Sequence, residues 1–72
     1  MKERIKSVLK RTLKLENITD DFSKEISEKW DSLAQLNIVI ELEDEFKVSF
    51  TPEEIPLLVS IVEIENILFK KE

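Results

Sequence analysis

The sequence predicts an all-α protein, a small antiparallel bundle of three main helices and one short helix. Two observations indicate this fold. Apolar residues recur at helical spacing in three separate stretches, and helix start signals precede the second stretch, a short turn-like segment and the last stretch. The 72 residues fit a single domain, residues 1–72, of a size that buries about 60% of the surface of its unfolded chain.

The first predicted helix covers residues 2–15. The positions of its buried stripe follow the i, i+3, i+4, i+7, i+8 spacing of a one-sided helix, and they are Ile5, Val8, Leu9, Thr12 and Leu13. The first 15 residues carry six cations and one acid, so the rest of a chain with a net charge of −5 carries −10. This basic helix is either a surface for nucleic acid or anionic lipid or a solvated face that offsets the acidic body. We favour the solvated face, because a short basic helix without aromatic residues between the cations is a weak signal for nucleic acid.

Residues 16–30 are polar and lack a clear period, so we predict a long loop that apolar side chains pin to the core. These side chains recur every four residues, at Ile18, Phe22, Ile26 and Trp30. Loops longer than about 12 to 15 residues are commonly functional or disordered, and this one leads directly to Asp31 and Ser32. Trp30 is either an exposed recognition residue or an anchor against the core, and we favour the anchor.

Asp31 and Ser32 form a helix start signal, because a short side-chain oxygen can accept an unpaired N–H group of the first helical turn. We therefore expect Ser32 at the N-terminus of a helix that ends around Phe46 or Lys47. The broad apolar side that this helix offers to the core consists of Ile38, Val39, Leu42 and Phe46. A second apolar cluster beside Ser32, which we expect to be partly exposed, consists of Leu33, Leu36 and Ile40.

The segment after this helix begins with a short extended link over residues 48–50. Thr51 then starts a helix signal that has a proline at the first helical position and Glu54 as the partner in a capping box. Pro56 follows almost at once and opposes a long helix, because it lacks the N–H group that a helix interior needs. We therefore predict only a short helix or turn over 52–58.

The last predicted helix opens with a second capping box, from Ser60 to Glu63, and ends in Lys70 and Lys71. Its apolar stripe consists of Ile61, Ile64, Ile67 and Leu68. Glycine is absent from the whole chain, so any left-handed turn must use Asn, Asp or another residue.

The composition argues against several classes of function. The chain has no Cys and no His, so it lacks thiolates, the commonest metal ligand and the usual base near neutral pH. We therefore expect neither an enzyme nor a metal site, and the acid-rich stretch 41–45 lacks the alternating ligands and the glycine of a calcium loop. No apolar run approaches about 18 residues, so we expect a cytoplasmic protein without a membrane span. The acidic body argues against nucleic acid and for partners with basic surfaces.

Several motifs after residue 30 together resemble the acyl carrier protein family. They are Asp31-Ser32-Leu33 followed by an apolar helix, Glu43-Asp44-Glu45-Phe46, Val48-Ser49-Phe50 and Pro52-Glu53-Glu54-Ile55. The chain length, the order of the helices and the mid-chain position of the serine also agree with that family. The resemblance covers most of residues 30–70 and implies an acyl-carrier-like fold.

The resemblance also implies a covalent cofactor. A phosphopantetheinyl transferase would attach 4'-phosphopantetheine to Ser32 through a phosphodiester, and Asp31 would assist the metal-dependent step of that transferase. The arm would hold acyl intermediates as thioesters and present them to acyl-transferring or acyl-modifying enzymes of fatty acid, polyketide or other specialised acyl metabolism. Because the cofactor brings the thiol, the protein itself need not be catalytic.

Partner enzymes would meet the helix that follows Ser32. The residues implied in this contact are Leu33, Leu36, Asn37, Ile40, Glu41 and Asp44. For each of the three apolar residues, packing in the core is an open alternative.

The sequence also departs from the family pattern. Carriers of fatty acid synthesis commonly bear acids early in this helix, where this chain has Ala34 and Asn37, and Trp30 stands directly before the Asp-Ser pair. These departures favour a specialised carrier, which we expect to be a monomer. Two other interpretations stay open: a carrier of aminoacyl groups, and a non-catalytic helical interaction module in which Ser32 is only a helix cap.

Overall fold

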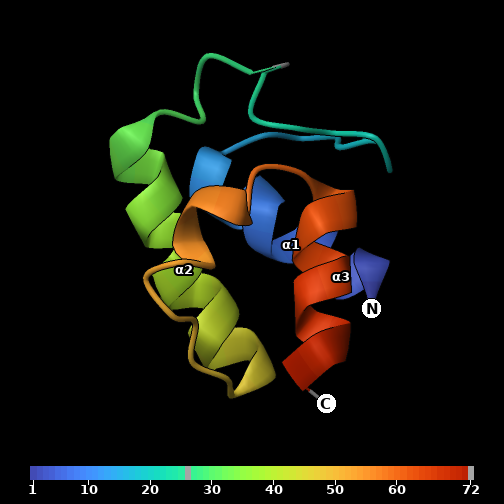
Figure 1. Cartoon of the computed structure of the whole chain (residues 1–72). Coiled ribbons are helices and arrows are strands. Elements are labelled where there is room, and N and C mark those ends of the chain that lie inside the picture. The colour runs from blue at the N-terminus through green and yellow to red at the C-terminus, as the bar shows by residue number, and fades with distance from the viewer. Residues whose placement is uncertain (26, 72) are drawn as a thin grey trace.

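The computed structural model describes residues 1–25 and 27–71 of the chain. It contains three α-helices and one 3₁₀-helix (Figure 1), which are α1 (Lys2–Leu13), α2 (Ser32–Phe46), η1 (Ile55–Leu57) and α3 (Ile61–Lys71). None of the described residues forms a strand, and their single β-type pairing is an isolated antiparallel bridge between Ser23 and Ser60. The predicted all-α class is therefore confirmed.

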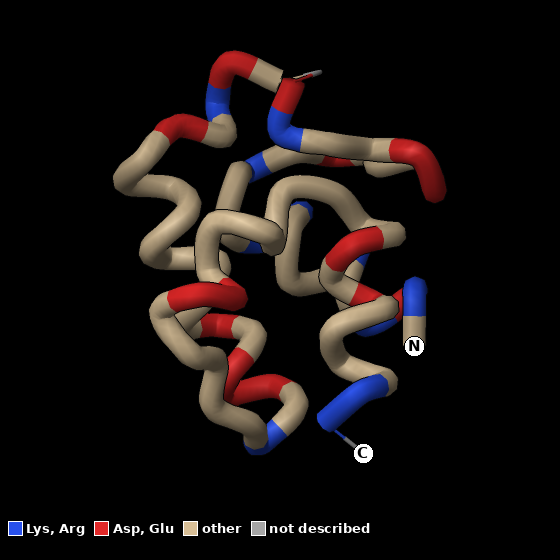
Figure 2. Tube along the Cα trace, in the orientation of Figure 1, with Lys and Arg blue, Asp and Glu red and all other residues tan. Residues whose placement is uncertain are grey.

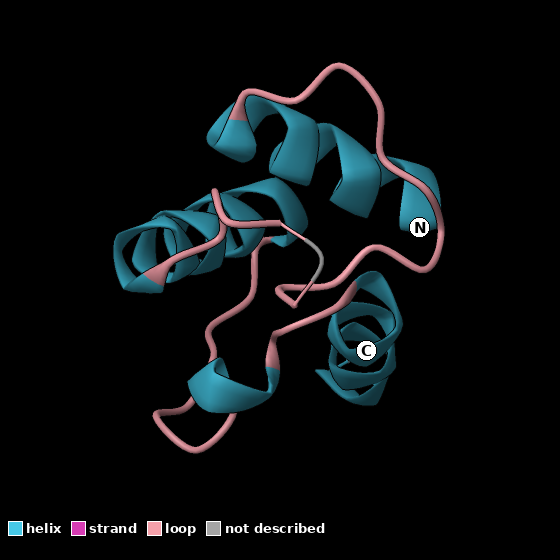
Figure 3. Ribbon diagram, turned by 90° about the horizontal axis from the view of Figure 1, so that it is seen from above, coloured by secondary structure: helices cyan, strands magenta, loops and turns pink. Residues whose placement is uncertain are grey.

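The core lies between the three helices. α1 packs against both α2 and α3, and in the view from above it spans one side of the molecule while η1 lies on the opposite side (Figure 3). The helices contribute the buried side chains Ile5, Val8, Leu9, Leu13, Ile38, Val39, Leu42, Ile61, Ile64, Ile67 and Leu68. The apolar stripes predicted for the three helices therefore form the core, with Thr12 and Phe46 half-buried at its edge.

Two lysines end helices in the left-handed conformation that glycine usually adopts. Lys14 follows α1 with φ 57°, and Lys47 follows α2 with φ 55°. The backbone N–H groups of these residues donate to the carbonyl oxygens of Lys10 and Glu43 respectively. In this chain without glycine, lysine takes the left-handed position, and its cation is well placed at the negative end of a helix dipole. α1 thus ends two residues before the predicted limit.

The long loop between α1 and α2 is held by the apolar side chains that the sequence indicated. Ile18, Phe22 and Trp30 are buried, and the rings of Phe22 and Trp30 stack with their centroids 5.9 Å apart. Trp30 is 2% exposed, so it is an anchor and not an exposed recognition residue. The fourth predicted anchor, Ile26, lies outside the described residues.

Polar contacts fasten the same loop to α1 and to the start of α3. The N–H of Lys24 donates to the carbonyl of Val59 at 2.7 Å, and the N–H of Ile61 donates to the carbonyl of Phe22 at 3.1 Å. A hydrogen-bonded ion pair joins Asp20 to Lys6 of α1. This bond lowers the pKa of Asp20 and raises the pKa of Lys6, because each charge stabilises the other.

Helix caps organise the C-terminal half. Thr51 and Glu54 form both halves of the predicted capping box, since the Thr51 N–H donates to the Glu54 carboxylate at 2.9 Å and the Glu54 N–H donates to the Thr51 hydroxyl at 3.2 Å. Only a turn and η1 follow, as Pro56 predicts. Before α3, the Ser60 hydroxyl accepts the N–H of Glu63 at 3.1 Å.

Candidate functional site

α2 begins with a cap from Asp31. The backbone of Asp31 is extended, and the Oδ1 of Asp31 accepts the N–H of Ala34 at 2.8 Å. The carbonyl oxygen of Asp31 accepts the N–H of Gln35 at 2.9 Å. Ser32 is the first residue of the helix. The expected place of Ser32 at a helix N-terminus is confirmed, but the alternative that Ser32 itself is the cap is wrong, because Asp31 supplies the capping oxygen.

The Ser32 side chain is exposed at this helix end. Within the described residues its hydroxyl has no hydrogen-bond partner, and neither do the backbone N–H groups of Ser32 and Leu33. Free N–H groups at the positive end of a helix dipole favour an anion nearby. The first turn of α2 therefore combines an accessible hydroxyl with a local preference for negative charge.

An exposed apolar patch follows Ser32 along α2. It consists of Leu33, Leu36 and Ile40, whose exposed fractions are 68%, 56% and 62%. The alternative that these side chains belong to the core is therefore wrong. Single exposed apolar residues are common, but three on one helix beside the same hydroxyl form a contiguous contact surface.

The four acids of α2 have three kinds of surroundings, and the first is that of Glu43, whose Oε2 accepts the N–H of Phe50 at 2.8 Å. Glu41 and Glu45 face α1, where Glu41 pairs with Arg11 at 3.4 Å and Glu45 pairs with Arg4 at 2.9 Å. Asp44 instead points to solvent, with 80% of its side chain exposed and only a distant contact of 3.7 Å to Lys47. Figure 2 shows these acids along the C-terminal half of α2. Two cations of α1 thus pair with acids of the same chain, which agrees with the charge-offsetting role favoured from the sequence.

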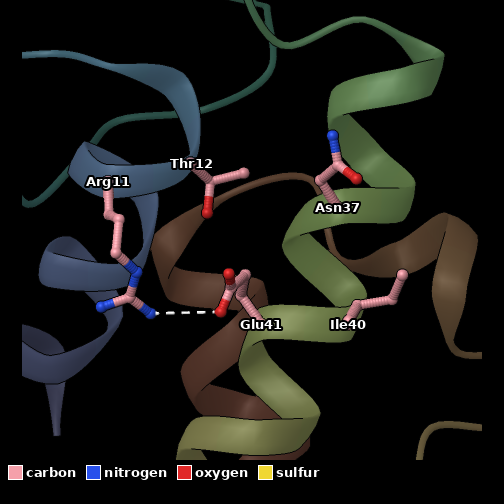
Figure 4. A pocket seen from close by; sticks show the side chains of 5 residues that line it. All are labelled: Arg11, Thr12, Asn37, Ile40 and Glu41. Carbon is pink, nitrogen blue, oxygen red and sulfur yellow. Dashed lines mark hydrogen bonds and ion pairs between the residues drawn. The ribbon is translucent and has the colours of Figure 1, made fainter.

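A shallow groove of about 210 Å³ lies between α1 and α2. Figure 4 shows its lining residues, which are Arg11, Thr12, Asn37, Ile40 and Glu41. In this view the Arg11 and Glu41 pair crosses from α1 to α2, and the side chain of Ile40 points away from α1.

Sequence reasoning missed a polar clamp beside Ser32. The indole N–H of Trp30 donates to Oε1 of Gln35 at 2.6 Å, and Nε2 of Gln35 donates to the carbonyl oxygens of Ile55 at 2.9 Å and Leu58 at 3.0 Å. The clamp, which we define as these three hydrogen bonds of Gln35, joins the loop before the cap and the first turn of α2 to the first residue of η1 and to the residue that follows η1. One signal was available: Gln35 lies three and seven residues before Ile38 and Leu42, in line with the core stripe.

The described part of the chain contains no group of three or more acidic, His or Cys side chains arranged to hold a metal ion. None of the helices described is long and apolar enough to cross a membrane. We compared the chain with protein-family models, with curated proteins and with solved structures, and found no match in any of the three comparisons.

Proposed function

We propose that this chain is an acyl carrier protein that is modified on Ser32. The observation that carries the proposal is the Ser32 hydroxyl at the first position of α2, directly after the cap from Asp31: it is exposed and makes no hydrogen bond to the described residues. It supports the proposal because a transferase needs a serine that is accessible and whose modification leaves the helix cap intact. The sequence motifs around this serine supply the identity of the modification, 4'-phosphopantetheine.

The helix end suits a phosphodiester. The N–H groups of Ser32 and Leu33 and the helix dipole favour a negative group on the serine oxygen. Asp31 uses Oδ1 for the cap, which leaves Oδ2 without a partner among the described residues, available to the metal-dependent step of the transferase. The bound arm would supply a thiol for thioester chemistry, and the residues of this chain would hold and present it.

The exposed patch and Asp44 give this carrier a surface for its partners. A partner would cover Leu33, Leu36 and Ile40 and would meet the negative charge of Asp44 with basic side chains, as complementary interfaces do. Asn37 lies on the same exposed side. The expected partners are a phosphopantetheinyl transferase and enzymes of a specialised acyl or aminoacyl pathway in the cytoplasm, with the carrier as a monomer.

The same patch supports a second candidate, a non-catalytic interaction module. An exposed apolar helix face of this kind can dock in the groove of another protein without any cofactor. The two candidate functions differ in one requirement, because only the carrier needs the Ser32 hydroxyl.

The deciding measurement is intact mass after incubation with coenzyme A, Mg²⁺ and a broad-specificity phosphopantetheinyl transferase. The native chain should gain one phosphopantetheinyl group, and Ser32→Ala should gain none. Ser7→Ala is a matched control, because Ser7 is an exposed serine on α1 and its replacement should leave loading unchanged. No gain in the native chain, with the transferase active on another carrier, would favour the interaction module.

A further inference from the structure

The Gln35 clamp joins α2 to the η1 segment by hydrogen bonds across the line of contact between them, which we call the seam. The amide of Gln35 uses its oxygen and both of its N–H donors, so its main hydrogen-bonding capacity is filled. The groups it satisfies are the N–H of Trp30, a side chain that is 2% exposed, and two backbone carbonyls of the η1 segment. If α2 and η1 separated at this seam, the indole N–H of Trp30 and the carbonyl of Leu58 would lose the partner that Gln35 provides, while the carbonyl of Ile55 would keep only the N–H of Leu58 at 3.2 Å. Breaking such part-buried hydrogen bonds is costly.

The clamp stands between Ser32 and the core. At 100° per residue, Gln35 lies about 60° around α2 from Ser32, towards the buried side that holds Ile38 and Leu42. An apolar chain that is tethered to Ser32 and turns towards this side of the first helical turn meets the hydrogen bonds of Gln35 to Trp30, Ile55 and Leu58 before it reaches the contact between α2 and η1.

A tethered chain also has an apolar surface that it reaches without breaking any bond. The exposed patch of Leu33, Leu36 and Ile40 begins at the residue after Ser32 and continues for two turns of α2. A short chain gains little from deeper burial, because the hydrophobic gain grows with each methylene that leaves water. The surface is therefore the favoured place for short cargo.

We infer that Gln35 is a specificity-determining residue, which keeps the cargo of the carrier out of the core and on the exposed patch. The cargo that fits this arrangement is a short or polar acyl group, for which burial offers little. This inference rests on the proposed function, since it needs cargo tethered to Ser32. It concerns the handling of that cargo and goes beyond the attachment.

The test compares native protein with Gln35→Leu, each loaded with an acetyl or an octanoyl pantetheine arm by the transferase and checked by intact mass. The readouts are the melting temperature and the indole N–H resonance of Trp30, the single Trp of the chain. In the native protein both readouts should be the same for the two cargoes. In Gln35→Leu the octanoyl form should melt higher, with the unfolding equilibrium constant falling by up to about fourfold for each methylene buried.

Asn66→Leu is the matched control. It makes an amide-to-leucine change at an exposed position of α3, away from the clamp and from the partner surface of α2, and should behave as the native protein does. If Gln35→Leu fails to fold, Trp30→Phe removes the indole N–H donor of the clamp together with part of a buried ring, and the difference in melting temperature between its acetyl and octanoyl forms then serves as the readout.

Two results would overturn the inference. One is an octanoyl-dependent rise in melting temperature with a shifted Trp30 resonance in the native protein, which would show that cargo passes the closed clamp. The other is a Gln35→Leu or Trp30→Phe protein whose melting temperature is the same with the acetyl and the octanoyl cargo. That result would show that Gln35 does not keep cargo out of the core. A chain that gains no mass at all refutes the proposed function itself, and the inference falls with it.

Discussion

The carboxylate of Asp31 accepts the N–H of Ala34 at 2.8 Å, so the cap of α2 is separate from the hydroxyl of Ser32. The two adjacent residues therefore contribute differently to the protein. Asp31 stabilises the helix end, whereas Ser32 leaves its oxygen unbonded among the described residues and open to solvent. A group attached to Ser32 would not disturb the hydrogen bond that holds the helix end.

The first prediction follows from this division. Asp31→Ala should lower the free energy of unfolding by about 0.5 to 2 kcal/mol, the usual cost of a lost N-cap. Ser32→Ala should change it by less than about 0.5 kcal/mol, as exposed substitutions do. Urea unfolding of the three proteins, followed by circular dichroism, measures both values. A loss in Ser32→Ala as large as that in Asp31→Ala would contradict the assignment of the cap.

The second prediction separates two ion pairs between α1 and α2. Arg4 bonds the Glu45 carboxylate at 2.9 Å and the Glu45 carbonyl at 2.8 Å, and its guanidinium lies 4.5 Å from the ring centroid of Phe46. Arg11 makes a single contact of 3.4 Å with Glu41. Arg4→Met should therefore cost about 1 kcal/mol of stability, and Arg11→Met close to zero, since isolated exposed pairs contribute little.

Chemical unfolding at low and at high salt tests this prediction. The difference between the Arg4 and Arg11 variants should persist in high salt, because the carbonyl bond and the aromatic contact of Arg4 are screened less than an exposed charge pair. Equal losses in the two variants would show that the extra contacts of Arg4 do not stabilise the interface.

The helices and their core faces were predictable because local signals and global packing agree. α2 ends at Phe46 as predicted, and its residues Ile38 and Leu42 are fully buried. The capping box of Thr51 and Glu54 also forms as its spacing indicates. In each case the signal lies within a few residues of the structure that it specifies.

The parts that sequence reasoning missed depend on contacts between distant segments. The Gln35 amide meets the Ile55 carbonyl across 20 positions, and the Lys6 ammonium meets Asp20 across the loop. Neither partner can be chosen from spacing on one helix. The sequence also could not tell which acids of α2 are free to meet a partner protein. Glu41 pairs with Arg11 of α1, whereas Asp44, only three residues later, faces solvent.

The third prediction concerns acid sensitivity at the end of α3. Lys71 forms an ion pair of 2.7 Å with Glu54 and lies 5.3 Å from the ring centroid of Phe50. The hydrogen bond from Lys71, together with the capping box, lowers the pKa of Glu54 below its usual value of 4.5. The folded state thus binds this proton less readily than the unfolded chain. The stabilisation is fully present above pH 4.5 and is lost as the pH falls through the lowered pKa of folded Glu54.

Glu54→Gln isolates this contribution. The stability of the native protein should fall more steeply than that of the variant as the pH decreases below about 4.5, and the two curves should run parallel above it. Thermal unfolding over a series of acidic buffers gives both curves. The carboxylate of Asp20, whose pKa is also lowered, titrates in both proteins and therefore cancels in the difference. A constant gap between the curves at every pH would refute the prediction.

The last prediction tests which acids of α2 steer the transferase. Asp44 is 80% exposed and has no close partner among the described residues, so Asp44→Lys should reverse a charge on the recognition surface and leave the fold unchanged. We expect slower loading of Ser32 at low salt and convergence with the native rate at high salt, because steering by exposed charges is screened. Glu63→Lys on α3, an exposed acid on another helix, is the control. Glu41→Lys would also remove the pair with Arg11, so it mixes recognition with packing. If Asp44→Lys and Glu63→Lys load at the same rate, net charge and not a surface on α2 determines recognition.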